Sequence, residues 1–356
     1  MTRHESPAPA HPIRLVLMLL LLSLLTTACG DGGPAGSEHD APNATLPAVS
    51  ATGSGSVSAS SGEGPRIVAT FSVLGDLVRN VAGGEAQLTT LVGPGMDAHT
   101  FEPSPADNRE LAVADLIFEN GLEFETWLDD LYESSESRAE RVLVTEGMKN
   151  LILAVEHDEE EVTHEAEEGH KADEEEEHGE YDPHVWHDVN NTTYMVERIR
   201  DSLAAADPEN ADRYRSNAER YSSELRKLDA YIVQQVGRLP EERRQLVTTH
   251  DTFGYFARRY GFQILDTALG ITTEESEPSA GEVAGLIREI KTAGVPAVFA
   301  ENVSNAGVME RVAQETGAEL APPLYTDALG EPGSEGATYI AMERYNVTTI
   351  VAALKK

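Results

Sequence analysis

The stretch DPENADRYRSNAERYSSELRKLDAYIVQQVGRL, residues Asp207–Leu239, predicts one long helix in the middle of the chain. It contains no Gly or Pro between Glu209 and Val236, and its apolar and aromatic residues recur at intervals of three, four and seven. This spacing places them on one face of a helix. We expect about 28 helical residues, or about 42 Å at 1.5 Å per residue. A helix of this length between two other regions is typical of a connecting element.

Short apolar runs alternate with helical patterns on both sides of the long helix. Before it come IVATF (67–71), a helical SVLGDLVRNVAG and QLTTLV (87–92), and after it RQLVTTH, FQILDTAL and PAVFAEN alternate with helical segments. Such alternation favours mostly parallel sheets flanked by helices. We therefore predict an α/β fold with two lobes, residues 65–206 and 241–356, joined by one long rigid helix, residues 207–240. Two such lobes place a ligand in the cleft between them.

The N-terminus has the features of an export signal followed by a tether. An apolar run of 11 residues, Leu15–Leu25, follows two arginines, and it is shorter than the roughly 20 residues that span a bilayer. The only cysteine, Cys29, follows directly. The arrangement resembles a bacterial lipoprotein signal, which implies a signal peptide at 1–28 and lipidation of Cys29; the alternative is ordinary cleavage nearby. Residues 29–64 are rich in Gly, Ser, Ala and Pro, as in flexible tethers.

The charge of the chain is strongly negative and unevenly distributed. There are 62 acidic and 27 basic residues, a net charge of −35. This balance argues against nucleic acid or an anionic membrane surface as a partner and is compatible with cations. The segment 156–180 holds 14 acids and one base, and we expect it to be a disordered loop because it has little apolar surface to bury.

Four polar residues stand at positions where an α/β fold would place a ligand site. His99 follows the run QLTTLV, His250 ends RQLVTTH, Asp327 follows an apolar run, and His184 lies in DPHVWHD. They are separated by 85, 66 and 77 residues, so their spacing alone does not identify a metal site.

Four motifs carry a resemblance to a known family: GMDAHTFEPSPAD, DPHVWHD, TTHDTFGYFARRYG and YTDALG. In this order they resemble the ligand motifs of the zinc/manganese-type (cluster A-I) solute-binding proteins of bacterial ABC importers. The resemblance extends from about residue 67 to the end of the chain. It implies one metal between the lobes, with His99 and His184 from the first lobe and His250 and Asp327 from the second.

This ligand set favours zinc. Three imidazoles and one carboxylate form a closed four-coordinate set for Zn²⁺ and leave no position for an activated water. Members of the family specialised for manganese usually have glutamate where this chain has His250, and imidazole favours the softer ion. Mn²⁺ remains the alternative cargo. The closed set and the absence of an HExxH motif argue against an enzyme.

Other histidines and acids near the motifs have less certain roles. Ligand imidazoles usually donate their second N–H to a carboxylate, and five acids could accept it or could equally be caps or turn residues: Asp97, Asp182, Asp188, Asp251 and Glu301. His187, where the family usually has leucine, is expected at the surface or beside the ligands, and Trp186 in the core. The acidic loop is either a solvated segment or an auxiliary weak metal site formed by His157, His164, His170 and His178.

The function expected from these features is an exported receptor that captures Zn(II) and delivers it to an ABC permease. It would be a monomer that contacts the membrane only through its lipid anchor, at the outer face of the cell membrane or in the periplasm. The alternatives are an exported metallohydrolase, a surface adhesin, and a siderophore or haem receptor. No protein-binding patch supports the adhesin, and an anionic chelate would require basic residues, which are scarce near the motifs.

Overall fold

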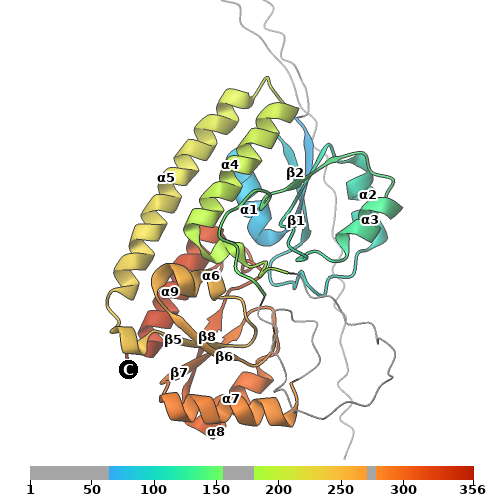
Figure 1. Cartoon of the computed structure of the whole chain (residues 1–356). Helices are drawn as coiled ribbons and strands as arrows, with labels where there is room; N and C mark the ends of the chain where they lie inside the picture. Colours follow the sequence, from blue (N-terminus) through green and yellow to red (C-terminus); the bar gives the residue numbers. More distant parts are fainter. Residues whose placement is uncertain (1–63, 155–179, 271–277) are drawn as a thin grey trace, which may run out of the picture. The chain divides into compact units, whose positions relative to one another are not determined.

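The computed structural model describes residues 64–154, 180–270 and 278–356 (Figure 1). The predicted signal peptide, the tether with Cys29 and most of the acidic segment lie outside the described residues. The first lobe is built on a four-stranded parallel sheet in the order β2-β1-β3-β4. Its strands are β1 (Arg66–Phe71), β2 (Gln87–Val92), β3 (Leu116–Glu119) and β4 (Glu140–Leu143).

Both faces of this sheet are covered. In β1, Ile67 and Phe71 belong to the large core and Val68 to a second, smaller core, because successive side chains point to opposite faces. In β3 the same alternation places Phe118 and Ile117 in different cores. The helices of this lobe are α1 (Ser72–Ala82), α2 (Pro105–Val113), α3 (Leu128–Ser134) and α4 (Val189–Ala206).

Helix α2 begins at a capping box. Ser104 and Asp107 form a capping box in which the Ser104 hydroxyl accepts from the N–H of Ala106 at 3.2 Å and Asp107 accepts from the N–H of Ser104 at 2.7 Å. Pro105 occupies the first helical position, where its missing N–H costs nothing. The loop that carries His99 therefore ends at a well-defined residue.

The second lobe consists of two parallel strand pairs whose neighbours β5 and β7 contact each other. Figure 1 shows α7 and α8 on one side of these strands and α6 and α9 on the other. Strand β8 contains Pro322 and Pro323 and pairs only with β7, an edge position that tolerates proline. The elements are β5 (Gln245–Thr248), α6 (Gly254–Tyr260), β6 (Gln263–Thr267), α7 (Ala280–Ala293), β7 (Ala297–Glu301), α8 (Gly307–Thr316), β8 (Glu319–Leu324) and α9 (Tyr339–Leu354).

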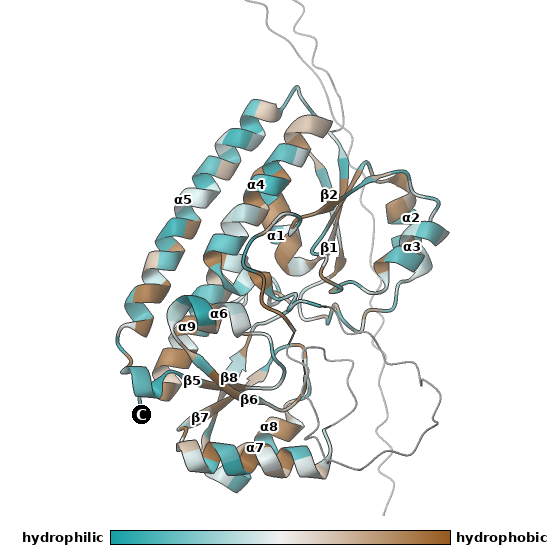
Figure 2. Cartoon of the chain, viewed as in Figure 1, coloured by the Kyte–Doolittle hydropathy of each residue, from teal (hydrophilic) through white to brown (hydrophobic). Residues whose placement is uncertain are grey.

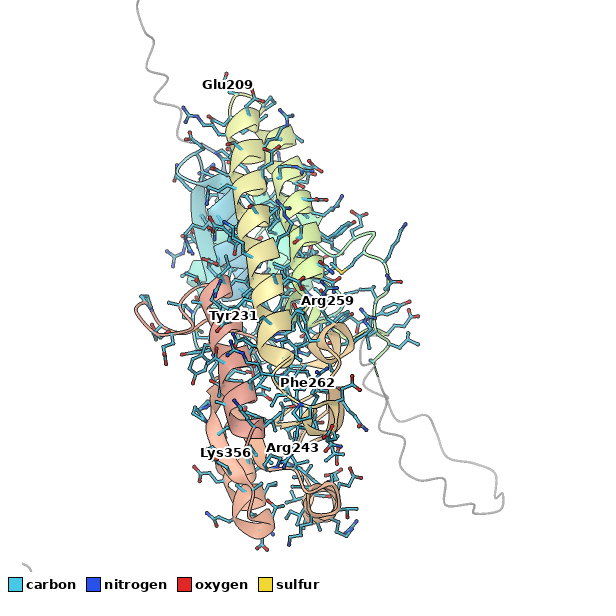
Figure 3. All side chains as sticks on the ribbon, turned by 90° about the vertical axis from the view of Figure 1, so that its left-hand side faces the viewer. Glu209, Tyr231, Arg243, Arg259, Phe262 and Lys356 are labelled. Carbon is cyan, nitrogen blue, oxygen red and sulfur yellow. The ribbon has the colours of Figure 1, made fainter. Side chains whose placement is uncertain are left out.

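The predicted long helix is α5 (Ala211–Val236), with 26 residues or about 39 Å. It is shorter than the expected 207–240, because the Asp207 side chain accepts from Asn210 in a turn before the helix begins. It packs on α1 and α4 of the first lobe and on α6 and α9 of the second, and its buried face carries Tyr214, Leu225 and Leu228. In Figure 2 its outer surface is largely hydrophilic, and Figure 3 shows α9 beside it near Tyr231.

Hydrogen bonds between buried groups join the two lobes directly. The Tyr339 N–H donates to Asp76 of α1 at 3.0 Å, and the Tyr339 hydroxyl donates to the Trp186 carbonyl at 2.7 Å. The Trp186 indole donates to the Thr326 carbonyl at 3.1 Å. Tyr255 of α6 donates to the Asp182 carbonyl at 2.8 Å. The described parts of the chain include no helix that is both long and apolar enough to span a bilayer.

Candidate metal centre

Four side chains that are far apart in sequence meet between the lobes: His99, His184, His250 and Asp327. Each can offer one ligand atom, and these atoms all lie within 4.8 Å of one another. His99 lies in the loop between β2 and α2, and His184 precedes a short 3-10 helix, Val185–His187. His250 follows β5, and Asp327 follows β8. The structure thus brings together all four residues that the motifs singled out.

Several separations within this set lie near the edges of a coordination tetrahedron, and the whole set spans no more than 4.8 Å. Metal–ligand distances of 2.0–2.1 Å give edges of about 3.3–3.4 Å. Here the Nε2 atoms of His99 and His184 are 3.3 Å apart, and Asp327 carboxylate oxygens lie 3.1 Å from His250 Nε2, 3.6 Å from His184 Nε2 and 3.7 Å from His99 Nε2. His250 Nε2 and Asp327 Oδ2 are buried without a hydrogen-bond partner. Buried polar atoms that converge in this way fit a divalent cation.

Asp182 orients His184. One oxygen of Asp182 accepts from the backbone N–H of His184 at 2.9 Å and contacts its Nδ1 at 2.8 Å, which directs Nε2 toward the other three residues. The first residue of α6, Gly254, lies against the other oxygen: a Cβ at this position would be 2.7 Å from Asp182 Oδ2. A glycine is therefore required for the second lobe to approach this carboxylate so closely.

Glu301 holds His250 in the same manner. Its Oε1 accepts from the backbone N–H groups of Thr249 and His250 at 2.9 and 3.0 Å. Its Oε2 contacts His250 Nδ1 and accepts from the Thr326 hydroxyl at 3.4 Å. Glu301 is the last residue of β7 and only 3% exposed. Carboxylates that fix an imidazole ligand in this way also select the tautomer that leaves Nε2 available to a metal.

A strained loop supports His99 and His184, the candidate ligands of the first lobe, and was not identified from the sequence. Three successive residues after Asn120 have left-handed backbone, with φ of 77°, 58° and 59°. The buried Glu125 carboxylate accepts from the N–H of Asn120 at 2.8 Å and from Thr70 at 2.6 Å, and burial raises its pKa to about 7. Asn120 then donates to the Pro183 carbonyl at 2.9 Å, and the Phe124 ring contacts His99 at 4.7 Å. The sequence ENGLEFE offers one weak signal for this, its glycine.

Burial and charge set the protonation of the site before metal binds. Burial lowers the pKa of His99 to about 3, so this imidazole is neutral. Burial also acts to lower the pKa of His250, but the charges of Glu301 and Asp327 outweigh it and raise that pKa well above its usual value. For Asp327, burial acts to raise the pKa, but the three histidines, His250 most strongly, lower it. The site thus combines the Asp327 carboxylate, a neutral His99 imidazole and a His250 imidazole with a raised pKa. This combination is suited to a cation.

Of the other acids considered from the sequence, Asp97 also touches the ligand set. It accepts from the backbone N–H of His99 at 2.9 Å. Asp188 instead caps α4 by accepting from the Asn190 N–H at 2.9 Å, and the backbone N–H of Asp251 donates to Gly270 at 2.9 Å. Asp188 is therefore a helix cap.

Of the two positions expected for His187, at the surface or beside the ligands, the surface is excluded. Its side chain is 0% exposed, its Nδ1 lies 2.9 Å from Glu343 of α9, and its ring stacks on Phe253 with centroids 4.6 Å apart. It is not part of the four-residue cluster. Trp186 lies in the core as predicted. The loop histidines His157, His164, His170 and His178 lie outside the described residues.

The fold and the cluster together define a two-lobed metal-binding receptor. Residues 67–353 match the family described as "zinc-uptake complex component A periplasmic", and the chain belongs to this family. Proteins of this family are substrate-binding receptors of ABC importers, not enzymes, so the chain is a metal-binding substrate-binding protein of this type. This confirms the predicted α/β fold and the predicted class of function.

Named relatives bind different metals. The chain is 36% identical over 295 residues to the manganese-binding lipoprotein MntA of Halalkalibacterium halodurans, covering 83% of this chain and 90% of that protein. It is 34% identical over 310 residues to the zinc-binding protein TroA of Treponema pallidum, covering 85% and 92%. The solved structure of TroA matches with a TM-score of 0.71 at 32% identity, covering 82% of this chain and 99% of that one.

Proposed function

We propose that this protein captures Zn(II) outside the cytoplasm through His99, His184, His250 and Asp327 and delivers it to an ABC permease. The observation that carries the proposal is the convergence of four buried ligand atoms within 4.8 Å. Each is 3% exposed or less, so a bound ion would be fully enclosed. A site with no open position suits capture rather than hydrolysis.

The donor atoms favour zinc over manganese. Three imidazole nitrogens and one carboxylate suit a tetrahedral, borderline-soft ion, whereas manganese prefers a shell dominated by oxygen. The 3.3 Å between the Nε2 atoms of His99 and His184 agrees with short metal–nitrogen bonds. The manganese receptor is the second candidate, and the 36% identity with a protein named as manganese-binding favours it.

The protein is expected to act as a monomer anchored through a lipid on Cys29, and the loop that includes His157, His164, His170 and His178 is expected to add weak metal sites. The lipoproteins among its relatives support the anchor. Mass spectrometry of the mature protein from a membrane fraction tests the anchor: a diacylglyceryl mass on Cys29 is expected, and an unmodified thiol would contradict it.

Equilibrium dialysis against an equimolar mixture of Zn(II) and Mn(II), followed by elemental analysis, tests the cargo. We expect one tightly held zinc per chain. A His99→Ala/His250→Ala double variant should lose it, because half of the ligand set is removed. Bound manganese in place of zinc would support the second candidate, and metal retained by the double variant would exclude these ligands.

A further inference from the structure

The segment that carries Asp327, residues 325–329, belongs to no helix and no strand. Its backbone groups therefore have no partners from regular secondary structure. Thr326, Asp327 and Ala328 are nevertheless 0% exposed, and buried backbone groups require hydrogen-bond partners. The groups that supply these partners decide where the Asp327 carboxylate lies.

The side chain of Asn302 bridges the two neighbours of Asp327. Its Oδ1 accepts from the N–H of Thr326 at 3.1 Å, and its Nδ2 donates to the carbonyl of Ala328 at 3.1 Å. The backbone N–H of Asn302 also donates to the carbonyl of Leu324, the last residue of β8, at 2.9 Å. Because an amide holds its donor and its acceptor at a fixed separation, this bridge constrains the backbone at Asp327 and thereby the direction of its side chain.

Both ends of the segment are held as well. Asn346 of α9 accepts from the N–H of Tyr325 at 3.0 Å and donates to the Tyr325 carbonyl at 2.6 Å. At the other end, the N–H of Leu329 donates to the hydroxyl of Ser72 at 2.9 Å, and its carbonyl accepts from the N–H of Gly95 at 2.9 Å. The ends therefore fix the place of the segment, and the bridge in its middle fixes the orientation of the candidate ligand.

Asn302 directly follows Glu301, the last residue of β7. The Glu301 carboxylate holds His250 through its backbone N–H and its ring, and the Asn302 amide holds Asp327 through the backbone on either side. Two consecutive residues therefore position both candidate ligands of the second lobe. The 3.1 Å between His250 Nε2 and an Asp327 oxygen depends on this one strand end.

We propose that Asn302 is a positioning residue for metal capture, whose side-chain amide holds Asp327 in the orientation in which its carboxylate joins the three imidazoles. The inference rests on the proposed function, because it concerns the metal that Asp327 would bind. Asp327 supplies the one carboxylate among the four candidate ligands. Without the bridge, this carboxylate would have to be ordered when the metal binds, and that ordering would reduce the binding free energy.

The zinc affinity of the full chain, measured by competition with chelators of graded strength, tests this role through Asn302→Ala. We expect a roughly tenfold weaker Kd, as for other residues that orient metal ligands. The same substitution in an Asp327→Ala background should change Kd by less than about twofold, because the bridge then has no ligand left to orient. A residue that only stabilised the fold would weaken binding equally in both backgrounds.

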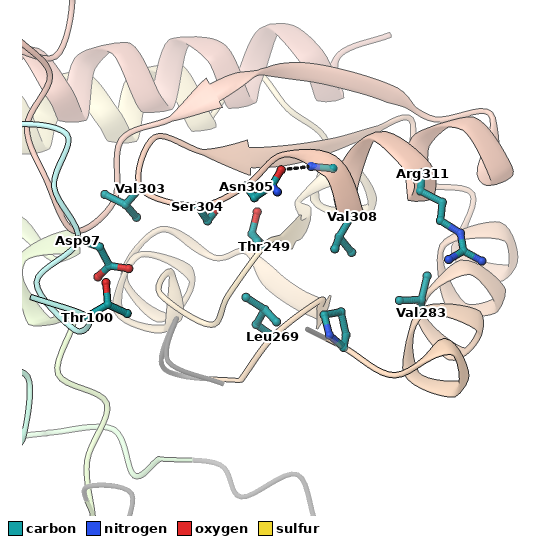
Figure 4. Close-up of a pocket in the computed structure, with 12 residues that line it drawn as sticks. Asp97, Thr100, Thr249, Leu269, Val283, Val303, Ser304, Asn305, Val308 and Arg311 are labelled. Carbon is teal, nitrogen blue, oxygen red and sulfur yellow. Dashed lines mark hydrogen bonds between the residues drawn. The ribbon is translucent and has the colours of Figure 1, made fainter. Parts of the chain in front are cut away.

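Asn305→Ala is the matched control. Asn305 is an exposed asparagine of the same loop, and its side chain accepts from the N–H of Gly307 at the start of α8 at 2.9 Å, the dashed line in Figure 4. Its replacement should leave Kd unchanged. Thermal unfolding without metal reports whether each variant is folded. If Asn302→Ala does not fold, Asn302→Ser takes its place in both backgrounds, because it is uncharged and its hydroxyl is too short to bridge both neighbours of Asp327.

Two results would overturn the positioning role. One is a wild-type Kd in a folded Asn302 variant. The other is an equal loss of affinity with and without the Asp327 carboxylate, which would assign Asn302 to general stability. Wild-type protein that binds no metal, or an Asp327→Ala variant with unchanged Kd, would instead refute the proposed function or its ligand set.

Discussion

Replacement of Glu301 by Gln should trap His250 in a form that cannot bind metal. The Gln oxygen can still accept from the backbone N–H groups of Thr249 and His250, which lie 2.9 and 3.0 Å from Oε1. The amide NH₂ then faces His250 Nδ1, which has to become an acceptor. The neutral ring of His250 then keeps its one proton on Nε2, the atom that lies 3.1 Å from an Asp327 oxygen. If the Gln amide were flipped, its NH₂ would face the two backbone N–H groups, and a donor would then oppose two donors.

The expected loss is a charge-assisted hydrogen bond, about 1.5–3 kcal/mol, which corresponds to a roughly 10- to 100-fold weaker Kd for zinc. Competition with a chelator of known affinity measures it, and thermal unfolding without metal reports whether the variant is folded. Glu343→Gln is the control, because Glu343 is a buried carboxylate that contacts the His187 ring outside the ligand set. The Kd of the Glu343→Gln variant for zinc should change by less than roughly tenfold, the smallest change expected for Glu301→Gln. A folded Glu301→Gln variant with wild-type affinity, or equal losses in both variants, would refute this reasoning.

Three further predictions follow from the same geometry. Because His250 has a raised pKa and is protonated before metal arrives, binding at pH 7 should release about one proton and tighten as pH rises; calorimetry in buffers of different ionisation enthalpy should show it, and zero release would contradict it. Gly254→Ala should weaken zinc binding roughly tenfold by displacing Asp182, while Gly285→Ala, which has space for a Cβ, should not. Deletion of residues 158–179 should leave one tight site and remove weaker ones in a metal titration; loss of the tight site would show that it is not formed by the lobes.

Elements with strong local signals could be predicted from the sequence. The periodic apolar face of α5 and the capping box at Ser104 depend on neighbours a few residues away, and both are present in the structure. Strand β8 could not be predicted in this way. Its two prolines argue against a strand. They are tolerated only because β8 lies at an edge of the sheet, and this edge position depends on the fold.

The candidate site was predictable only through the four motifs. Side chains separated by 85, 66 and 77 residues meet only in the folded chain, so no local spacing could reveal the set. The partner of His187 shows the same limit, because Glu343 lies 156 residues away. The pairing of Glu301 with His250 could be anticipated as one of several options. Only the structure shows that strand β7 places Glu301 beside β5.

The hydrogen bonds that Trp186, Tyr255 and Tyr339 make between the lobes have a thermodynamic consequence for metal capture. They join protein groups to one another, so the relative orientation of the lobes is fixed when the chain folds. The conformational entropy of the four side chains is therefore lost when the chain folds. It is not lost again on metal binding, so it does not reduce the binding free energy. Metal binding should accordingly bury little additional apolar surface and show a small heat-capacity change.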